Sequence, residues 1–226
     1  MSFLLHIEST STVCSVAISD NNNLLFIKEL NNGYTHAENL HVFISECLKE
    51  VDITTKQLNA VSVSSGPGSY TGLRIGFSAA KGLAYALNIP LITVDTLQAL
   101  TVMALEKIDV NALYCPMLDA RRMEVYCAIY NDQLQEILPA NALILDAESI
   151  SQFKKDKPVY FFGDGMPKAK NLLETLPGTH FIDDVNLSAK ALVNITYRKF
   201  ENKEFANIAY AEPFYLKEFF FNSPKK

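Results

Sequence analysis

The residues best suited to chemistry are four histidines, but their spacing argues against a shared site. His36 and His41 are five residues apart, which on a helix turns their side chains roughly 140° away from each other. A metal-binding HxxxH pair lies only ~40° apart on a helix. His6 and His180 fall in different predicted elements, and no GxSxG string of a serine hydrolase occurs. We therefore expect no catalytic residue, no metal site and no cofactor of the chain's own.

Two carboxylates, Glu8 and Asp119, end the first strands of two similar predicted β-meanders. In a nucleotide cleft, acids at such related positions could position a hydrated magnesium ion. The alternative, which we favour, is that they are strand-end carboxylates exposed to water, or that Asp119 pairs with Arg121 or Arg122.

A glycine-rich string, SSGPGSYTGLRIG, covers residues 64–76 between a predicted strand and a predicted helix. Free backbone N–H groups at a helix start can hold an anion. However, the string lacks the GxxxxGK[ST] spacing of a phosphate-binding P-loop, and no lysine follows its glycines. We favour a tight strand-to-helix turn, capped by Ser69 or Thr71, over an anion site.

The helix that follows carries a ridge of small residues spaced four apart: Gly72, Gly76, Ala80 and Ala84. A glycine inside a helix costs about 1 kcal/mol relative to alanine, so two of them need a reason. For any one residue, packing against the chain's own sheet is the commoner reason, and contact with another chain is the alternative. The preceding amphipathic helix, residues 37–50, offers a further apolar flank, so the two helices could form half of a four-helix interface. The partner-interface residues we predict are Leu40, Phe43, Ile44, Cys47, Tyr70, Gly72, Leu73, Gly76, Phe77, Ala80 and Ala84.

Hydrophobic periodicity predicts an α/β fold in which one arrangement of elements occurs twice. In the first half we expect strands over 3–8, 13–19, 24–30, 60–64 and 91–94, and helices over 36–50, 71–87 and 96–107. In the second half we expect strands over 113–119, 123–130, 133–138, 159–162 and 180–182, and helices over 147–155, 166–176 and 188–203. We predict two subdomains, residues 1–105 and 106–226, each with a mixed sheet.

Composition narrows the class of protein further. The 226 residues are 49% hydrophobic and 20% charged, as in ordinary globular proteins, and the net charge is −5. An acidic total argues against binding nucleic acid by bulk electrostatics, which weakens direct nucleic-acid binding through Lys168, Lys170 and the terminal lysines. The four cysteines are far apart among apolar neighbours, so we expect buried, reduced thiols. The sequence shows neither a signal peptide nor a run of ~20 apolar residues, and we expect a soluble, cytoplasmic protein without membrane contact.

Three strings resemble the TsaB (YeaZ) family. They are LLHIESTST at residues 4–12 with CSVAI at 14–18, the glycine-rich string up to Gly76, and DARRMEVY at 119–126. The resemblance runs in the same order across essentially the whole chain, except for the last ten residues. It implies the ASKHA fold of actin, Hsp70 and sugar kinases, with two ribonuclease-H-like subdomains.

The resemblance also implies a function without chemistry of its own. A TsaB-like subunit binds the catalytic subunit TsaD through its first two helices, recruits the ATPase TsaE, and forms a homodimer when TsaD is absent. ATP and a metal are used by the partners, and the tRNA is met only through the complex, which modifies the adenosine beside the anticodon. The Gly163-Asp164-Gly165 loop sits where related ATPases hold adenosine, but here it leads into Met166-Pro167 and a basic helix. The alternative is a small ATP-dependent enzyme or a metallopeptidase-like protein of the same fold. The role of Phe219–Phe221 and any nucleotide at the subunit junction stay open.

Overall fold

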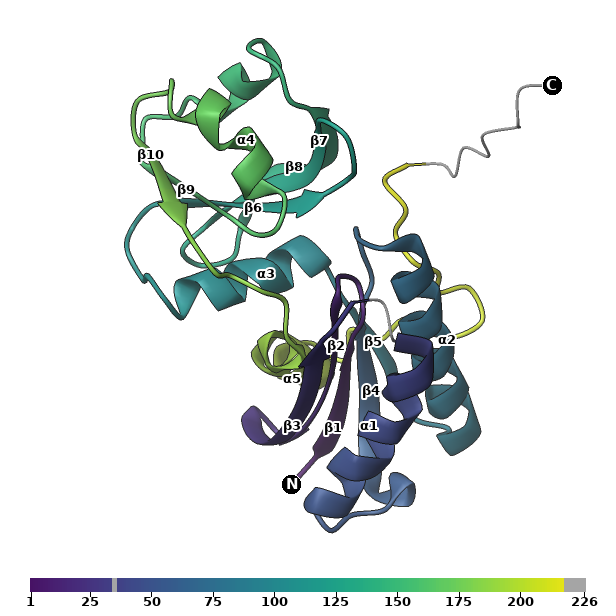
Figure 1. Ribbon diagram of the computed structural model, residues 1–226. Coiled ribbons are helices and arrows are strands. Elements are labelled where there is room, and N and C mark those ends of the chain that lie inside the picture. The colour runs from purple at the N-terminus through teal and green to yellow at the C-terminus, as the bar shows by residue number, and fades with distance from the viewer. Residues whose placement is uncertain (34–35, 218–226) are drawn as a thin grey trace, which may run out of the picture.

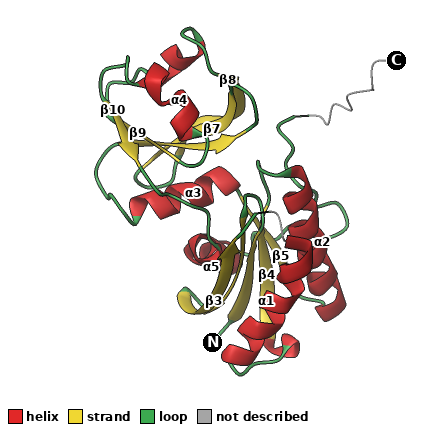
Figure 2. Ribbon diagram, in the orientation of Figure 1, coloured by secondary structure: helices red, strands yellow, loops and turns green. Residues whose placement is uncertain are grey.

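A computed structural model describes residues 1–33 and 36–217 and shows two five-stranded sheets, each covered by helices (Figures 1 and 2). The first sheet has the order β3-β2-β1-β4-β5. Strand β1 pairs antiparallel with β2 and parallel with β4, so the sheet is mixed, as predicted. Its strands are β1 (Phe3–Glu8), β2 (Val13–Asp20), β3 (Asn23–Asn31), β4 (Leu58–Ser64) and β5 (Leu91–Val94).

Three helices cover the two faces of this sheet. Helices α1 (His36–Glu50) and α2 (Tyr70–Leu87) pack on one face, and α5 (Leu192–Glu201) packs on the other. Successive residues of β1 alternate between the two faces: Leu5 packs beneath α1 and α2, whereas Leu4 belongs to a cluster with α5. Burial on both sides explains the continuous apolar runs of the central strands.

The second sheet repeats the plan with the order β10-β9-β6-β7-β8. Helix α3 (Thr96–Leu105) contributes to the core on one face, and α4 (Met166–Leu173) to the core on the other. The strands are β6 (Leu113–Asp119), β7 (Glu124–Asn131), β8 (Glu136–Ile144), β9 (Val159–Phe162) and β10 (Thr179–Ile182). The predicted α/β class and the duplicated meander are confirmed.

Several predicted bounds shift by one to three residues, and three predicted elements differ more clearly from the structure. The strand expected at 133–138 is β8, which starts later because Asn131 accepts hydrogen bonds from the backbone of Gln133 and Gln135 and so holds a turn there. The helix expected at 147–155 is only a short 3-10 turn, Ser149–Phe153. The helix expected from residue 188 opens with a 3-10 turn, Ala189–Ala191, before α5 begins at Leu192.

The predicted division into residues 1–105 and 106–226 separates the two sheets, but it places α3 in the first subdomain although this helix packs on the second sheet. It also does not describe the packing of the C-terminal part. Helix α5 contacts β1, β4 and β5 of the first sheet. Beyond it, Ala206 forms a bridge with Leu91 at the edge of the same sheet. Residues 192–206 therefore return to the first subdomain after the second sheet is complete. Phe219–Phe221 lie outside the described residues.

Two expectations from composition can be compared with the structure. All four cysteines are free and buried, as predicted. Within residues 1–33 and 36–217, no helix combines the length and apolar character needed to span a bilayer.

Candidate functional site

Glu8 lies at the end of β1 and is completely buried. One of its carboxylate oxygens accepts hydrogen bonds from the backbone N–H of Thr10 at 2.7 Å and from the Thr10 hydroxyl at 2.5 Å. The Ser64 hydroxyl donates to the other oxygen. Burial raises the pKa of Glu8, although these hydrogen bonds oppose the effect. The expectation of a water-exposed carboxylate is wrong for Glu8, which orders the turn between β1 and β2.

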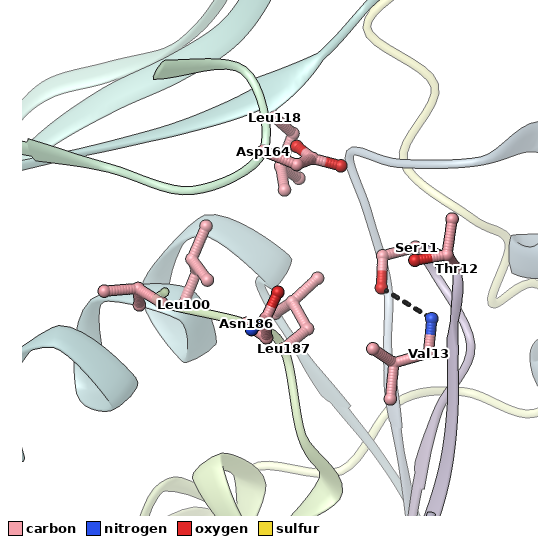
Figure 3. Close-up of a pocket in the computed structure, with 9 residues that line it drawn as sticks. Ser11, Thr12, Val13, Leu100, Leu118, Asp164, Asn186 and Leu187 are labelled. Atoms are coloured by element: carbon pink, nitrogen blue, oxygen red, sulfur yellow. Dashed lines mark hydrogen bonds between the residues drawn. The ribbon is translucent and has the colours of Figure 1, made fainter. Parts of the chain in front are cut away.

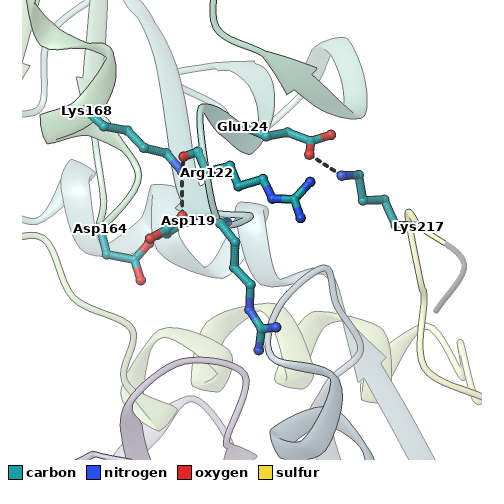
Figure 4. A network of polar contacts seen from close by, with 7 residues as sticks. Asp119, Arg122, Glu124, Asp164, Lys168 and Lys217 are labelled. Atoms are coloured by element: carbon teal, nitrogen blue, oxygen red, sulfur yellow. Dashed lines mark hydrogen bonds and ion pairs between the residues drawn. The ribbon is translucent and has the colours of Figure 1, made fainter. Parts of the chain in front are cut away.

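Asp119, at the end of β6, is held by a polar network from three directions (Figure 4). Its Oδ1 lies 2.5 Å from the Lys168 ammonium and accepts the Arg121 backbone N–H at 2.7 Å. Its own backbone N–H donates to Asp164 at 2.9 Å. Burial works to raise the pKa of Asp119, but the bonds from Lys168 and Arg121 outweigh it and hold that pKa below its ordinary value. The predicted ion pair with the side chain of Arg121 or Arg122 is wrong, because Lys168 takes that place.

One small cavity lies between the two subdomains. Figure 3 shows Asp164 of the second subdomain facing Ser11 and Thr12 of the first. The cavity has a volume of about 30 Å³, enough for about one water molecule, whereas small-molecule sites occupy roughly 300–1,000 Å³. The lining residues are Ser11, Thr12, Val13, Leu100, Leu118, Asp164, Val185, Asn186 and Leu187.

The Gly163-Asp164-Gly165 loop lies tightly against β6. A Cβ atom at Gly163 would lie 2.4 Å from the Met117 carbonyl oxygen, and one at Gly165 would lie 2.8 Å from the carbonyl carbon of Leu118. The glycines therefore serve the close approach of loop and strand, while Asp164 between them is exposed and lines the interdomain cavity.

The four histidines lie apart from one another, and His180 on β10 stacks on Tyr160 with the ring centroids 4.8 Å apart. His6 is completely buried, with its ring nitrogens 2.8 Å from the Ser62 hydroxyl and 2.9 Å from the Ser19 hydroxyl, and burial lowers its pKa to about 3. The Nε2 of buried His36 lies 2.8 Å from the Ser11 carbonyl oxygen, to which it donates, whereas His41 is exposed on α1. Within the described ranges, no three or more His, Cys, Asp or Glu side chains gather in a way that could hold a metal ion.

The predicted small-residue ridge of α2 faces inward. A Cβ at Gly72 would lie 2.0 Å from the Ser9 carbonyl oxygen, and one at Gly76 would lie 2.2 Å from the Ser9 hydroxyl. That hydroxyl donates a hydrogen bond to the Gly72 carbonyl at 2.9 Å. Ala80 and Ala84 are fully buried. The expectation that this ridge faces another molecule is wrong, because it packs against the chain's own β1–β2 turn and sheet.

The other predicted interface residues lie mostly on the same inner face. Their relative exposures do not exceed 6%, with Tyr70 the partly exposed exception. The inward-facing residues are Leu40, Phe43, Ile44, Cys47, Leu73 and Phe77. The residues predicted from the sequence are therefore those by which α1 and α2 pack on their own sheet. They are not the residues that these helices expose to solvent.

The outer surface of the same two helices forms an open groove of about 600 Å³. It is lined mainly by apolar and small side chains: Ala37, His41, Arg74, Ile75, Ser78, Ala79, Gly82 and Leu83. Gly82 is exposed, and a Cβ built on it would meet nothing within 4 Å. Ser78, Gly82 and Ala86 are four residues apart and all exposed, so a second small-residue row was present in the sequence on the opposite face of α2.

The architecture defines the class of protein first. Two mixed sheets with helices on both faces form the ASKHA fold, and the activator of the 2-hydroxyisocaproyl-CoA dehydratase from Clostridium difficile is similar in structure. That match has a TM-score of 0.53 at 8% identity and covers 91% of this chain and 98% of the activator. The structure of YeaZ from Pseudomonas aeruginosa is similar with a TM-score of 0.81 at 24% identity, over 96% of this chain and all of that one.

Sequence similarity then gives the family. Residues 33–218 match the family described as TsaD, tRNA N6-adenosine threonylcarbamoyltransferase. The chain belongs to this family, and it is similar in sequence to curated proteins named TsaB. The TsaB protein of Bacillus subtilis (strain 168) is 35% identical over 144 residues, which are 62% of this chain and 59% of that protein. The TsaB protein of Escherichia coli (strain K12) is 32% identical over 127 residues, or 56% of this chain and 54% of that protein. The chain thus spans a little over half the length of these relatives.

Proposed function

We propose that the chain is a non-catalytic subunit of the machinery that makes threonylcarbamoyladenosine in tRNA. In this proposal it binds a TsaD-type catalytic subunit through the outer face of α1 and α2 and recruits the ATPase TsaE. When the catalytic subunit is absent, a second copy of the chain takes its place. ATP and the metal belong to the partners, and the tRNA is met through the complex in the cytoplasm.

The observation that carries the proposal is the exposed glycine at position 82. A glycine in the interior of a helix costs about 1 kcal/mol relative to alanine. Within the described part of the chain nothing approaches Gly82 closely enough to require it. Close approach of a backbone from another molecule would account for such a glycine. The groove around Gly82 is lined by the apolar side chains of Ile75, Ala79 and Leu83. Arg74 and His41 are polar residues of the same lining. An apolar centre with polar groups around it is the ordinary make-up of a protein–protein interface.

The small interdomain cavity and the paired carboxylates near it support a subunit without chemistry of its own. The cavity there has a volume of about 30 Å³, room for about one water molecule, and Lys168 already neutralises Asp119. Both carboxylate oxygens of Glu8 accept hydrogen bonds from residues of the same subdomain, namely Thr10 and Ser64. An acyl-transfer or ATP-dependent enzyme would need room for its substrate and free groups facing it.

The interface is tested by Gly82→Leu in the full chain. We expect at least about a tenfold loss of affinity for the TsaD-type subunit, and the same loss for self-association, because the leucine fills the place of closest approach. Folding should be unaffected, since the position is open in the isolated chain. Asn194→Leu is the matched control, because it puts the same side chain at an exposed position of α5 on the far side of the sheet.

Calorimetric titration measures the affinity for the catalytic subunit, and analytical ultracentrifugation measures self-association. Unchanged association of Gly82→Leu would refute the interface. The subunit role is tested separately by threonylcarbamoyl transfer to tRNA. We expect transfer only when TsaD and TsaE accompany the chain, and transfer by the chain alone would refute the non-catalytic assignment.

A further inference from the structure

The C-terminal residues 205–217 run back beside α2 after α5 (Figure 1). At the start of this segment the backbone N–H of Ala206 donates to the Leu91 carbonyl of β5 at 2.8 Å. Further along, the ammonium of Lys81 on α2 donates to the Ala211 carbonyl at 2.8 Å. The segment is therefore fixed first to the sheet edge and then to the middle of α2.

The same segment then closes over the turn that starts α2. The Phe214 N–H donates to the Ser65 carbonyl at 2.7 Å. A Cβ at Gly66 would lie 2.4 Å from the Phe214 carbonyl oxygen, and Gly66 has a φ of +117°. The glycine therefore allows the segment to lie directly on the turn.

One residue later, a stack of side chains connects the segment to the groove. The Tyr215 ring lies 5.0 Å from the ring of Tyr70, the first residue of α2. The Arg74 guanidinium lies 4.1 Å from the centroid of the same Tyr70 ring. Arg74 also lines the groove between α1 and α2. The tilted contact between the two rings and the cation–π contact thus restrict the side chain of a groove residue.

The segment ends on the other subdomain. Lys217 forms an ion pair with Glu124, the first residue of β7 in the second sheet (Figure 4). The Glu124 side chain is 15% exposed and the Lys217 side chain 41% exposed, so we expect this pair to contribute no more than an ordinary surface ion pair. A continuous set of contacts therefore runs from the second sheet through Tyr215 and Tyr70 to Arg74.

We infer that residues 206–217 are a strap that fixes Arg74 in the groove and links its position to the second subdomain. A long arginine side chain loses conformational freedom when a partner orders it, and prior stacking reduces that cost. The strap would thus order Arg74 before a partner binds. Because the strap is attached to the second subdomain, the ordering of Arg74 would depend on the position of that subdomain. What the groove binds rests on the proposed function, whereas the linkage is a property of the isolated chain.

A charge-exchange cycle in the full-length chain tests the linkage. Lys217→Glu and Glu124→Lys each break the ion pair, and the double variant restores it with the charges exchanged. In each single variant we expect amide exchange across residues 65–70 to accelerate about two- to fivefold. The NMR signal of the Arg74 Nε–H should move away from its ring-shifted position over Tyr70. The double variant should recover both values. Lys56→Glu is the control for charge reversal at an exposed lysine outside the strap.

Single variants with unchanged exchange and an unchanged Arg74 signal would overturn the strap, as would a double variant that fails to recover. Partner binding gives a second readout. Tyr215→Ala should weaken binding of the TsaD-type subunit about two- to fivefold, while Tyr210→Ala, at a residue 83% exposed in the same segment, should not. If Tyr215→Ala binds as tightly as the original chain, the strap has no part in preparing the groove.

The two proposals fail in distinguishable ways. If Gly82→Leu leaves association intact while the charge exchange shifts Arg74, the interface is wrong and the strap stands. If Gly82→Leu abolishes association while Arg74 does not respond to the charge exchange, the strap is wrong and the interface stands.

Discussion

The same substitution, glycine to alanine, should have opposite effects at two positions of α2. At Gly72 the new Cβ would lie 2.0 Å from the Ser9 carbonyl oxygen, far inside the 3.4 Å at which ordinary contact begins. A backbone oxygen cannot swing away as a flexible side chain can, so α2 and the β1–β2 turn must separate. Overpacking of this kind costs about 1–3 kcal/mol, and separation also weakens the bond from the Ser9 hydroxyl to Gly72. The higher helix propensity of alanine offsets up to about 1 kcal/mol of this destabilisation. We expect Gly72→Ala to lower the free energy of unfolding by about 1–3 kcal/mol.

At Gly82 only the favourable effect remains, because the added Cβ meets nothing within 4 Å. Gly82→Ala should raise the free energy of unfolding by about 0.5–1 kcal/mol. Urea denaturation at neutral pH, followed by circular dichroism, measures both values under one set of conditions. Equal effects at the two positions, or a Gly72→Ala variant as stable as the original chain, would refute the assignment of inner and outer faces to α2.

Two further predictions concern buried polar groups. Burial lowers the pKa of His6 from 6.5 to about 3 in the folded chain. As the pH falls, the unfolded chain therefore takes up a proton at His6 before the folded chain does. The stability that His6 contributes is present above pH 6.5 and is lost as the pH falls toward 3. Between pH 6.5 and pH 4.5 the free energy of unfolding should fall by on the order of 2–3 kcal/mol because of His6. Urea denaturation at successive pH values measures this fall, and His6→Gln should remove it. An unaltered pH dependence in the variant would show that His6 is not its cause. The Tyr130 hydroxyl donates to Asp95 at 3.0 Å, and Asp95 caps α3 by accepting the Gln98 N–H at 2.8 Å. Tyr130→Phe should therefore cost about 1–3 kcal/mol in thermal unfolding, and an unchanged melting temperature would contradict a structural role for this bond.

Local sequence patterns predicted most elements because most strands here are short apolar runs between clear turn signals. β1 and β6 were predicted with their observed bounds, and α1 was predicted from the recurrence of Leu40, Phe43, Ile44 and Cys47. The pattern was less informative at 147–155, where only Ile150 and Phe153 of the short 3-10 turn are buried. Such a segment gains too little from packing to extend into a full helix.

Glu8 shows why the site was harder to predict than the fold. A carboxylate at a strand end is ordinarily solvated, and nothing adjacent to Glu8 indicates otherwise. The burial of its carboxylate depends on Ser64, which lies 56 residues further along the chain and comes close only because β4 pairs with β1. Asp119 is similar, since its partner Lys168 lies 49 residues away on α4. Spacing in the sequence cannot identify partners that only the strand order brings together.

The two rows of small residues on α2 show which glycine carries information about a partner. Both rows repeat every four residues, so periodicity alone cannot assign one to the core and the other to the surface. The glycines at 72 and 76 have a reason within the chain, because a Cβ at either would collide with Ser9. Gly82 has no such reason in the described structure, yet helix propensity still penalises it. The low helix propensity of Gly82 destabilises the isolated chain without any packing reason inside it, so this glycine points to a contact outside the chain. For the same reason, Gly82 is the position at which binding and folding can be tested separately.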